Sequence, residues 1–229
     1  FDSSAIAALT EHGARIAARK GKVTARFGRI ADIAREAAFL AQEQGKDEVV
    51  REMVHDAIQR TKFRASLPTR NFMRLLEDKV IRLRVQGSVV GQVNGLAVMT
   101  TGALSYGFHT RITATVGAGD GRLIDIQGES DLSGQIHTKG FHTISGLLRH
   151  LLKTNHPLCF SASIAFEQHY GVIDGDSASA AEVCCVLSAL TGTPLKQNLS
   201  ITGAIDQLGH LQAIGGVNEK IEGFFDACN

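Results

Sequence analysis

Hydrophobic residues recur at helical spacing through the first part of the chain, from Ser3 to about Arg64. Two sets with this spacing are Ile30, Ile33, Ala34, Ala37 and Ala38, and Val49, Met53, Val54 and Ile58. Apolar residues repeating every three or four positions lie on one face of a helix. We therefore predict a small all-helical domain of three or four helices over residues 1–66, broken once at residues 45–47.

The pattern changes after this region. Residues 65–71 contain Pro68 and interrupt the helical spacing, so we predict a linker and the first strand over residues 67–84. Short runs rich in Val, Ile and Thr then alternate with glycines, at residues 81–86, 91–101, 112–116 and 123–126. These runs indicate strands, and the glycine-rich residues 117–121 have the composition of a hairpin turn.

Helices and strands alternate in the rest of the chain. We predict helices at residues 139–153, at 177–190 and from 218 onward, and strands at residues 162–167, 199–206 and 211–214. The fold class is therefore α+β: a small helical N-terminal domain followed by an α/β domain over residues 85–229. The two parts differ in charge as well, because residues 1–84 carry 17 Lys or Arg against 11 Asp or Glu, whereas the remainder carries 7 against 12.

Composition narrows the classes of protein that need to be considered. No apolar run approaches the roughly 18 residues of a membrane span, and the N-terminus lacks a signal-peptide pattern, so we expect a cytoplasmic protein without a membrane partner. The four cysteines form no CxxC pair and the nine histidines show no ligand spacing. We therefore predict reduced thiols and no metal.

Ser177 lies where an apolar strand gives way to a run of helical composition, within Asp174-Gly-Asp-Ser-Ala-Ser179. A serine at a helix N-terminus is close to unpaired backbone N–H groups, which stabilise the oxyanion formed when a hydroxyl attacks a peptide carbonyl. Taken alone, the run favours a helix cap made by Ser177 or Asp176.

Lys220 follows the turn Gly215-Gly216 and falls in the first turn of the last predicted helix. The helix dipole disfavours a positive charge at that position, and burial would lower the pKa of the amine further. A neutral amine can accept the proton of a serine hydroxyl, so Ser177 and Lys220 would form a dyad that needs no His or Asp. An ordinary solvated lysine is the alternative interpretation.

Several motifs occur together in the order and spacing of one known family. The run GDSAS at residues 175–179, Thr202-Gly203, and GGVNEKIEGFF at 215–225 resemble the proteolytic domain of the Lon protease family, and Ser177 and Lys220 are 43 positions apart. Upstream matches are GQVNGLAV at 91–98, RITATV at 111–116 and DLSGQIHTKG at 131–140. The resemblance covers residues 85–228.

The resemblance implies a role for individual residues. Ser177 matches the nucleophile, Lys220 the general base, and Thr202 the hydroxyl that orients the lysine amine. Ala178 would offer its N–H to the oxyanion. The family activity is ATP-dependent endopeptidase cleavage of unfolded or misfolded proteins through an acyl-enzyme.

Two acidic residues, Asp174 and Glu129, occupy family-typical positions near this site. One departure is informative: bacterial housekeeping Lon enzymes usually carry Pro-Ser-Ala-Gly, whereas this chain has Asp-Ser-Ala-Ser at residues 176–179. This places the chain with the Lon-B-like branch.

The same resemblance implies that the helical domain is the lid of an AAA+ ATPase module, because in Lon proteases the peptidase domain follows such a module, which ends in a helical lid. Residues 23–32 are similar to the lid helix that brings a sensor arginine to the nucleotide; Arg26 is the first candidate and Arg29 the second, with solvent-facing arginines as the alternative. No phosphate-binding GxxxxGK[ST] loop is present. ATP and Mg²⁺ are thus expected only in a full-length enzyme, with none bound tightly here.

The chain begins without Met and ends at Asn229, whereas members of this family continue with another strand and helix, so the resemblance implies a C-terminally truncated piece. The family assembles as homo-oligomeric rings, usually hexamers, which implies a self-associating protein. Two alternatives remain open. A Ser-Lys amidase or self-processing enzyme would share the dyad without needing an unfoldase. A non-catalytic assembly or nucleic-acid-binding module would act through the basic helical segment and bind in a salt-sensitive manner.

Overall fold

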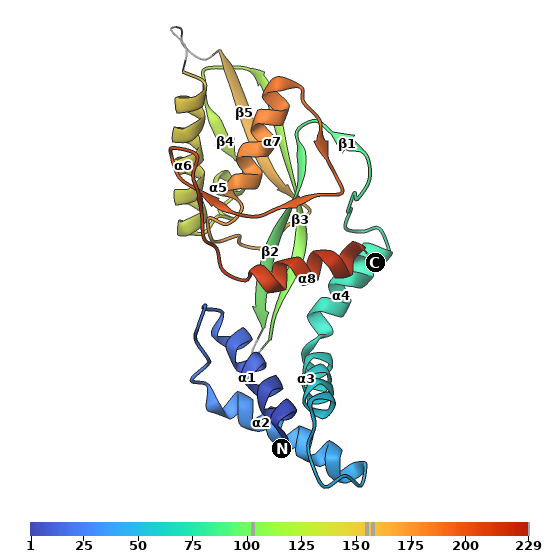
Figure 1. The fold of residues 1–229 in the computed structure, drawn as a ribbon. Coiled ribbons are helices and arrows are strands. Elements are labelled where there is room, and N and C mark those ends of the chain that lie inside the picture. Colours follow the sequence, from blue (N-terminus) through green and yellow to red (C-terminus); the bar gives the residue numbers. More distant parts are fainter. Residues whose placement is uncertain (102–103, 154–155, 157–158, 229) are drawn as a thin grey trace. The chain divides into compact units, whose positions relative to one another are not determined.

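The structure is a computed structural model that describes residues 1–101, 104–153, 156 and 159–228. These residues form two compact units, one over residues 1–72 and the other over most of residues 73–228 (Figure 1). Asn229, to which the predicted peptidase domain extends, lies outside the described residues. The predicted order, a helical N-terminal region followed by a mixed α/β domain with a sheet, is confirmed.

The helical unit consists of α1 (Ser3–Ala17), α2 (Phe27–Glu43), α3 (Arg51–Ala65) and the beginning of α4 (Leu67–Glu77). Asp2 caps α1, because its carboxylate accepts a hydrogen bond of 2.8 Å from the Ala5 N–H. The predicted break at residues 45–47 falls between α2 and α3. Apolar residues from the three long helices form the core, among them Ala5, Ala8, Ile33, Ala37, Leu40, Met53 and Val54.

The linker predicted over residues 67–84 is wrong in its first half, where α4 is helical. Pro68 is tolerated because it is the second residue of α4, where a backbone N–H has no partner within the helix. The strand predicted at residues 81–86 is also absent, and β1 begins only at Ser88. The backbone there is held by a side chain instead: the Arg82 N–H donates to Gln168 Oε1 at 2.9 Å.

The second unit is built on a five-stranded sheet. In spatial order the strands are β4 (Leu123–Asp125), β5 (Phe160–Glu167), β3 (Leu104–Ala118), β2 (Gln92–Thr101) and β7 (Ser200–Ile201). β3 and β5 run antiparallel, whereas β4 with β5 and β2 with β7 run parallel. The hairpin predicted at residues 117–121 is therefore wrong, because β5 lies between β3 and β4.

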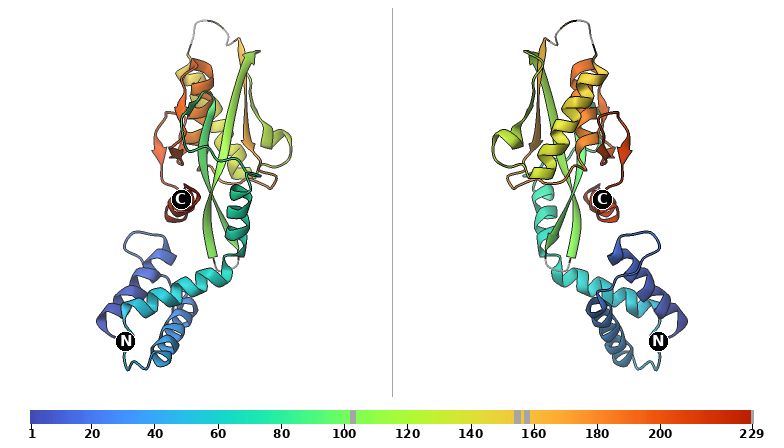
Figure 2. Two further views of the ribbon diagram at one scale, coloured as in Figure 1. Left: turned by 90° about the vertical axis from the view of Figure 1, so that its right-hand side faces the viewer. Right: turned by 90° about the vertical axis from the view of Figure 1, so that its left-hand side faces the viewer.

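Two helices, α6 (Gln135–Leu151) and α7 (Ser179–Thr191), cover one face of the sheet (Figure 2). Their apolar faces pack with the strands into one core that includes Ile112, Phe141, Ile144, Leu147, Ile164, Ala181 and Val186. A short helix, α5 (Ile126–Glu129), follows β4. Burial of these side chains supplies the main stabilisation of the unit.

The last part of the chain forms two small strand pairs and one helix. β1 (Ser88–Val89) pairs with β6 (Leu195–Lys196), and β8 (Ala204–Ile205) pairs with β9 (Leu211–Gln212), both antiparallel. The strand predicted over residues 199–206 is divided between β7 and β8, because Thr202 and Gly203 hydrogen-bond to Ser177 and Ala180 instead. The final helix, α8 (Val217–Cys228), matches the prediction closely. No helix among the described residues has the length and apolar character needed to cross a membrane.

Candidate active site

Ser177 lies in a tight turn of residues 174–178, which we call the Ser177 turn. Gly175 has φ of 94°, a conformation that side chains disfavour. The prediction that Ser177 opens the helix is wrong by two residues, since α7 begins at Ser179 with Ala178 as its N-cap. The Ser177 side chain is accordingly not a helix cap.

The segment between β7 and β8 holds this turn in place. The Gly203 N–H donates to the Ser177 carbonyl at 2.7 Å, and the Gly203 carbonyl accepts from the Ala180 N–H at 3.0 Å. The Thr202 hydroxyl donates to the same Ser177 carbonyl at 3.1 Å. Three hydrogen bonds therefore fix the backbone at the Ser177 carbonyl and at Ala180, just after it.

Lys220 lies one turn into α8, and its N–H donates to the Gly216 carbonyl at 2.9 Å. Gly216 has φ of 67°, and a Cβ there would lie 2.7 Å from Val98 Cγ2 on β2. A second close approach lies further along the helix, where a Cβ on Gly223 would be 2.0 Å from the Gly107 carbonyl oxygen of β3. Glycines therefore let α8 pack directly against the two central strands, which fixes where Lys220 points.

The three side chains to which the sequence assigns chemistry meet at one point. Lys220 Nζ lies 2.8 Å from Ser177 Oγ and 3.1 Å from Thr202 Oγ1. Lys220 is only 3% exposed, whereas Ser177 and Thr202 are half-buried. Burial lowers the pKa of the Lys220 amine, an effect opposed in part by the negative charge of Asp176. A buried amine with a lowered pKa, in contact with a hydroxyl, is equipped to accept that hydroxyl's proton.

The other predicted site residues lie at different places in the same unit. Ala178 directly follows Ser177 as the N-cap of α7. Asp174 caps α6, because its Oδ1 accepts from the Ile136 N–H at 3.0 Å and from the His137 N–H at 3.2 Å. Hydrogen bonds from backbone groups, that of Gly175 first, lower the pKa of Asp174. Glu129 is the exposed last residue of α5.

Arg26 and Arg29, the two candidate nucleotide-contacting residues, lie in the helical unit. Arg26 is the exposed N-cap residue of α2, and its backbone N–H donates to Thr24 Oγ1 at 3.1 Å. Arg29 is half-buried in the first turn of the same helix. Both are thus at a helix N-terminus, where positive charge and free N–H groups favour phosphate.

Sequence reasoning missed a buried polar cluster beside the Ser177 turn. His137, Asp125 and Glu182 are each less than a tenth exposed, and the imidazole Nε2 lies 3.6 Å from Asp125 Oδ2 and 3.8 Å from Glu182 Oε1. Glu182 offered a signal, since it is a single acid in an otherwise apolar helix. Nothing in the spacing of His137 and Asp125 marks them as its partners. Among the described residues no group of His, Cys, Asp and Glu side chains has the arrangement of a metal site.

Comparison with known families gives two matches that together cover most of the chain. Residues 79–224 match the model of the Lon protease (S16) C-terminal proteolytic domain. Residues 1–64 match that of the archaeal LonB AAA+ ATPase LID domain. The boundary between the matches falls close to the boundary between the two compact units.

Individual relatives agree with these matches. The chain is 44% identical over 164 residues to a putative Lon protease homolog of Haemophilus influenzae, and 41% identical over 156 residues to one of Escherichia coli. These alignments cover 71% and 67% of the chain and 27% and 26% of the relatives. An archaeal Lon protease of Pyrococcus abyssi is 28% identical over 229 residues, which is 99% of the chain and 22% of that protein. The chain thus spans about a quarter of the length of these three relatives.

Proposed function

The chain belongs to the Lon protease family and carries its proteolytic domain, and we propose that Ser177 and Lys220 form a catalytic dyad that cleaves peptide bonds in unfolded proteins. The observation that carries this proposal is the 2.8 Å contact between Lys220 Nζ and Ser177 Oγ, made by a lysine that is 3% exposed. Thr202 completes the group, because its hydroxyl lies 3.1 Å from the same amine.

Acylation is the first half of the proposed reaction. The Ser177 hydroxyl oxygen attacks the peptide carbonyl while neutral Lys220 takes the hydroxyl proton. The backbone N–H of Ala178 donates to the oxyanion of the tetrahedral intermediate. As the C–N bond breaks, Lys220 returns the proton to the leaving amine, and the substrate's acyl group stays on Ser177 as an ester.

Deacylation repeats these steps with water. Lys220 takes a proton from the water molecule that attacks the ester, and the second tetrahedral intermediate collapses with release of the carboxylic acid product. The proton held by Lys220 returns to Ser177 Oγ. The requirement in both halves is a neutral amine, which the lowered pKa of buried Lys220 favours.

Dependence on ATP is part of the proposal for the whole protein. It is supported by the match of residues 1–64 to an AAA+ ATPase lid. Arg26 and Arg29 lie at the N-terminal end of α2 and would contact nucleotide phosphates, with Mg²⁺ as the usual counter-ion. ATP hydrolysis would supply the work of unfolding and delivering substrate.

We also propose that the protein acts as a cytoplasmic homo-oligomeric ring, most simply a hexamer, on unfolded or misfolded proteins. Exposed apolar side chains on α8 support self-association: Val217, Ile221 and Phe225 recur every four residues and are 43%, 59% and 66% exposed. A stripe of this kind on one helix face is typical of a surface that another protein surface covers.

The test is hydrolysis of an unfolded fluorescent casein by the full-length enzyme with ATP, comparing wild type with Ser177→Ala and Lys220→Ala. We expect both variants to lose cleavage while oligomeric state and ATP hydrolysis persist. Normal cleavage by either variant would contradict the dyad. Cleavage of small amides without cleavage of casein would instead indicate an amidase or self-processing enzyme.

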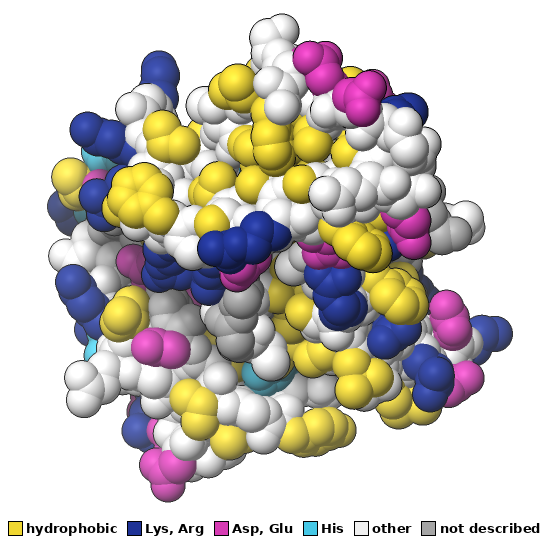
Figure 3. Space-filling model, turned by 90° about the horizontal axis from the view of Figure 1, so that it is seen from below, with side chains coloured by type: hydrophobic (Ala, Val, Ile, Leu, Met, Phe, Trp, Pro, Cys, Tyr) yellow, Lys and Arg dark blue, Asp and Glu magenta, His cyan; other side chains and the backbone are white. Residues whose placement is uncertain are grey.

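Nucleic-acid binding through the basic N-terminal segment has less support. Figure 3 shows one face of the molecule, on which Lys and Arg side chains are interspersed with acidic and hydrophobic ones. The N-terminal Lys and Arg residues also have few aromatic residues between them, whereas single-stranded nucleic acid is usually bound by basic and aromatic side chains together. Salt-sensitive DNA binding that survives Ser177→Ala would favour this alternative.

A further inference from the structure

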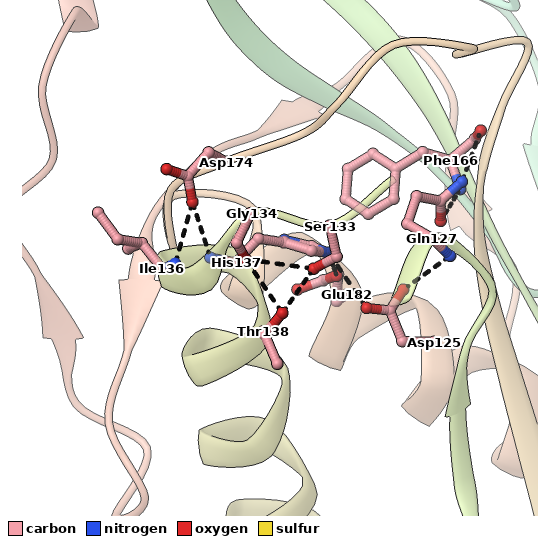
Figure 4. A network of polar contacts seen from close by, with 10 residues as sticks. All are labelled: Asp125, Gln127, Ser133, Gly134, Ile136, His137, Thr138, Phe166, Asp174 and Glu182. Carbon is pink, nitrogen blue, oxygen red and sulfur yellow. Dashed lines mark hydrogen bonds and ion pairs between the residues drawn. The ribbon is translucent and has the colours of Figure 1, made fainter. Parts of the chain in front are cut away.

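The buried cluster around His137 joins three elements of the peptidase unit. His137 lies in the first turn of α6, Asp125 ends β4, and Glu182 lies in the first turn of α7 (Figure 4). The imidazole Nε2 is 3.6 Å from one carboxylate oxygen and 3.8 Å from the other. His137 is 1% exposed, so these charges face one another away from water.

The contacts are too long to count as hydrogen bonds. Within the described part of the chain, His137 Nε2 and Glu182 Oε1 are buried without a hydrogen-bond partner. Buried ionisable groups that lack full hydrogen bonding destabilise a protein unless their charges balance. The balance of charge among His137, Asp125 and Glu182 therefore contributes to the stability with which β4, α6 and α7 pack together.

The charges that face the cluster can be named for each element. Burial raises the pKa of Glu182 to about 7, with Asp125 acting in the same direction and His137 against it. Burial alone would lower the pKa of His137, but its contacts with Asp125 and Glu182 raise it. Cys185 lies near Glu182 on α7, and burial raises the pKa of its thiol to about 12, so it is neutral. On β5 the neighbour is Phe166, whose ring meets the imidazole edge-on with a centroid separation of 5.3 Å.

His137 also holds the chain that enters the Ser177 turn. Its backbone N–H donates to Asp174 Oδ1 at 3.2 Å, and Asp174 is three residues before Ser177. The Gly134 N–H, just before α6, donates to the Ile173 carbonyl at 2.7 Å. The segment that leads into Ser177 is thus tied to the first turn of α6.

Glu182 holds the chain that leaves the same turn. It follows Ser177 by five residues, and its N–H donates to the Ala178 carbonyl at 3.0 Å. Its side chain faces His137. The residues before and after Ser177 are therefore both in contact with His137, Asp174 through the backbone N–H of this histidine and Glu182 through its Nε2.

We infer that His137, acting with Asp125 and Glu182, is a positioning residue that fixes the Ser177 hydroxyl against Lys220. None of the three residues touches the reacting atoms. The inference rests on the proposed dyad, and it adds that the reactivity of the dyad depends on a buried charge balance in the core. Displacement of a reacting group by about 1 Å can cost about 100-fold in rate, so a modest relaxation of the turn is enough.

The experiment measures kcat and KM for a fluorogenic peptide with the full-length enzyme between pH 5.5 and 9. We expect His137→Asn to lower kcat by at least about tenfold and to leave KM little changed, because no peptide-binding contact is removed. Replacing Glu182 with Gln in the same chain removes the carboxylate that would then lack its cation. The double variant should therefore recover part of the lost kcat, a coupling that independent destabilisation does not produce.

The matched control is Ser188→Ala, a buried polar residue of α7, the helix that carries Glu182. Ser188 Oγ donates to the Thr193 carbonyl and accepts from the Gly91 N–H, away from the Ser177 turn. If His137→Asn lowers kcat no more than Ser188→Ala, with each variant assayed below its own unfolding temperature, the positioning role is wrong.

Two further variants distinguish failure of the positioning role from misfolding and from failure of the proposed dyad. If His137→Asn fails to fold, the nearly isosteric Glu182→Gln carries the test: the ratio of wild-type to variant kcat should change as the pH passes through about 7, because only wild type has a group that titrates there, and a constant ratio overturns the inference. Ser177→Ala in the same assay separates the two proposals. Cleavage that survives it contradicts the dyad, whereas an inactive Ser177→Ala beside a fully active His137→Asn contradicts only the positioning role.

Discussion

Two polar clusters flank the Ser177 turn, and they differ in how closely their atoms approach. In the first, Lys220 Nζ is 2.8 Å from Ser177 Oγ and 3.1 Å from Thr202 Oγ1. In the second, His137 Nε2 is 3.6 and 3.8 Å from two carboxylate oxygens. The first cluster includes two half-buried hydroxyls, whereas all three side chains of the second are buried.

The difference separates proton transfer from positioning. A short contact between an amine and a hydroxyl allows a proton to pass directly from one to the other. Charges held at ion-pair distance without hydrogen bonds pass no proton to substrate, but their mutual attraction holds the backbone that carries them. The four predictions that follow test this division, beginning with the largest expected effect.

Replacing Lys220 with Met keeps an unbranched side chain, one heavy atom shorter, and removes the proposed base. We expect casein cleavage to fall about 1,000-fold or more, since loss of general acid–base catalysis typically costs 10²–10⁴-fold. Lys220→Arg should be equally inactive, because a guanidinium stays protonated. The control is Lys196→Met, which changes an exposed lysine of β6. Substantial cleavage by the Lys220→Met enzyme would mean that another group activates Ser177.

Stability should depend on pH through the second cluster. The pKa of Glu182 is raised in the folded state from 4.5 to about 7, so the folded protein binds more protons than the unfolded one between these values. The free energy of unfolding therefore falls as the pH rises from 4.5 to 7, by an amount on the order of 3 kcal/mol. The raised pKa of His137 acts in the same direction above pH 6.5, where its stabilising contribution is progressively lost.

Urea unfolding at a series of pH values measures this dependence. Glu182→Gln removes the titrating group, so the fall in stability from pH 5 to 7 should be smaller in the variant than in wild type. Parallel pH dependences for the two proteins would show that Glu182 does not titrate in this range.

Thr202→Val removes the hydroxyl that orients the amine while nearly preserving the volume of the side chain. We expect kcat to fall by about 10- to 100-fold, the range for one hydrogen bond to a group that becomes charged. Thr202→Ser, which keeps the hydroxyl, should retain most activity. The assay is peptide hydrolysis at saturating substrate, and similar rates for Val and Ser would contradict the orienting role.

The smallest effect concerns the backbone before Lys220. Gly216→Ala forces a side chain into φ of 67° and toward Val98, whereas Gly215→Ala meets nothing within 4 Å. We expect the first variant to lose about 1–2 kcal/mol of stability from the left-handed conformation alone. Thermal unfolding should show a lower transition temperature for Gly216→Ala than for Gly215→Ala. Equal transition temperatures would remove the argument that Gly216 sets the start of α8.

Much of the molecule could be predicted from the sequence because its signals are local. Apolar spacing predicted the helical domain, and the runs at residues 91–101 and 162–167 correspond to β2 and β5. The resemblance to a known family identified Ser177, Thr202 and Lys220. In the structure, Lys220 Nζ lies within 3.1 Å of both hydroxyl oxygens.

The errors arise where long-range contacts override local composition. Residues 81–86 have strand-like composition, but the Arg82 N–H bonds to the Gln168 side chain and not to a neighbouring strand. The turn-like residues 117–121 do not form a hairpin, because β5 inserts beside β3. In the cluster of His137, Asp125 and Glu182, the first two residues are 12 positions apart and Glu182 follows His137 by 45 positions. No local sequence pattern predicts that these side chains meet.

The most direct test of the account is to trap the acyl group on the chain. The full-length enzyme is incubated with a small peptide p-nitrophenyl ester, quenched in acid and mapped by mass spectrometry. We predict an acyl adduct on Ser177 that forms faster as the pH rises and Lys220 loses its proton, and no adduct in Lys220→Met at pH 7. An adduct on another residue, or equal acylation of Ser177 without Lys220, would contradict the dyad.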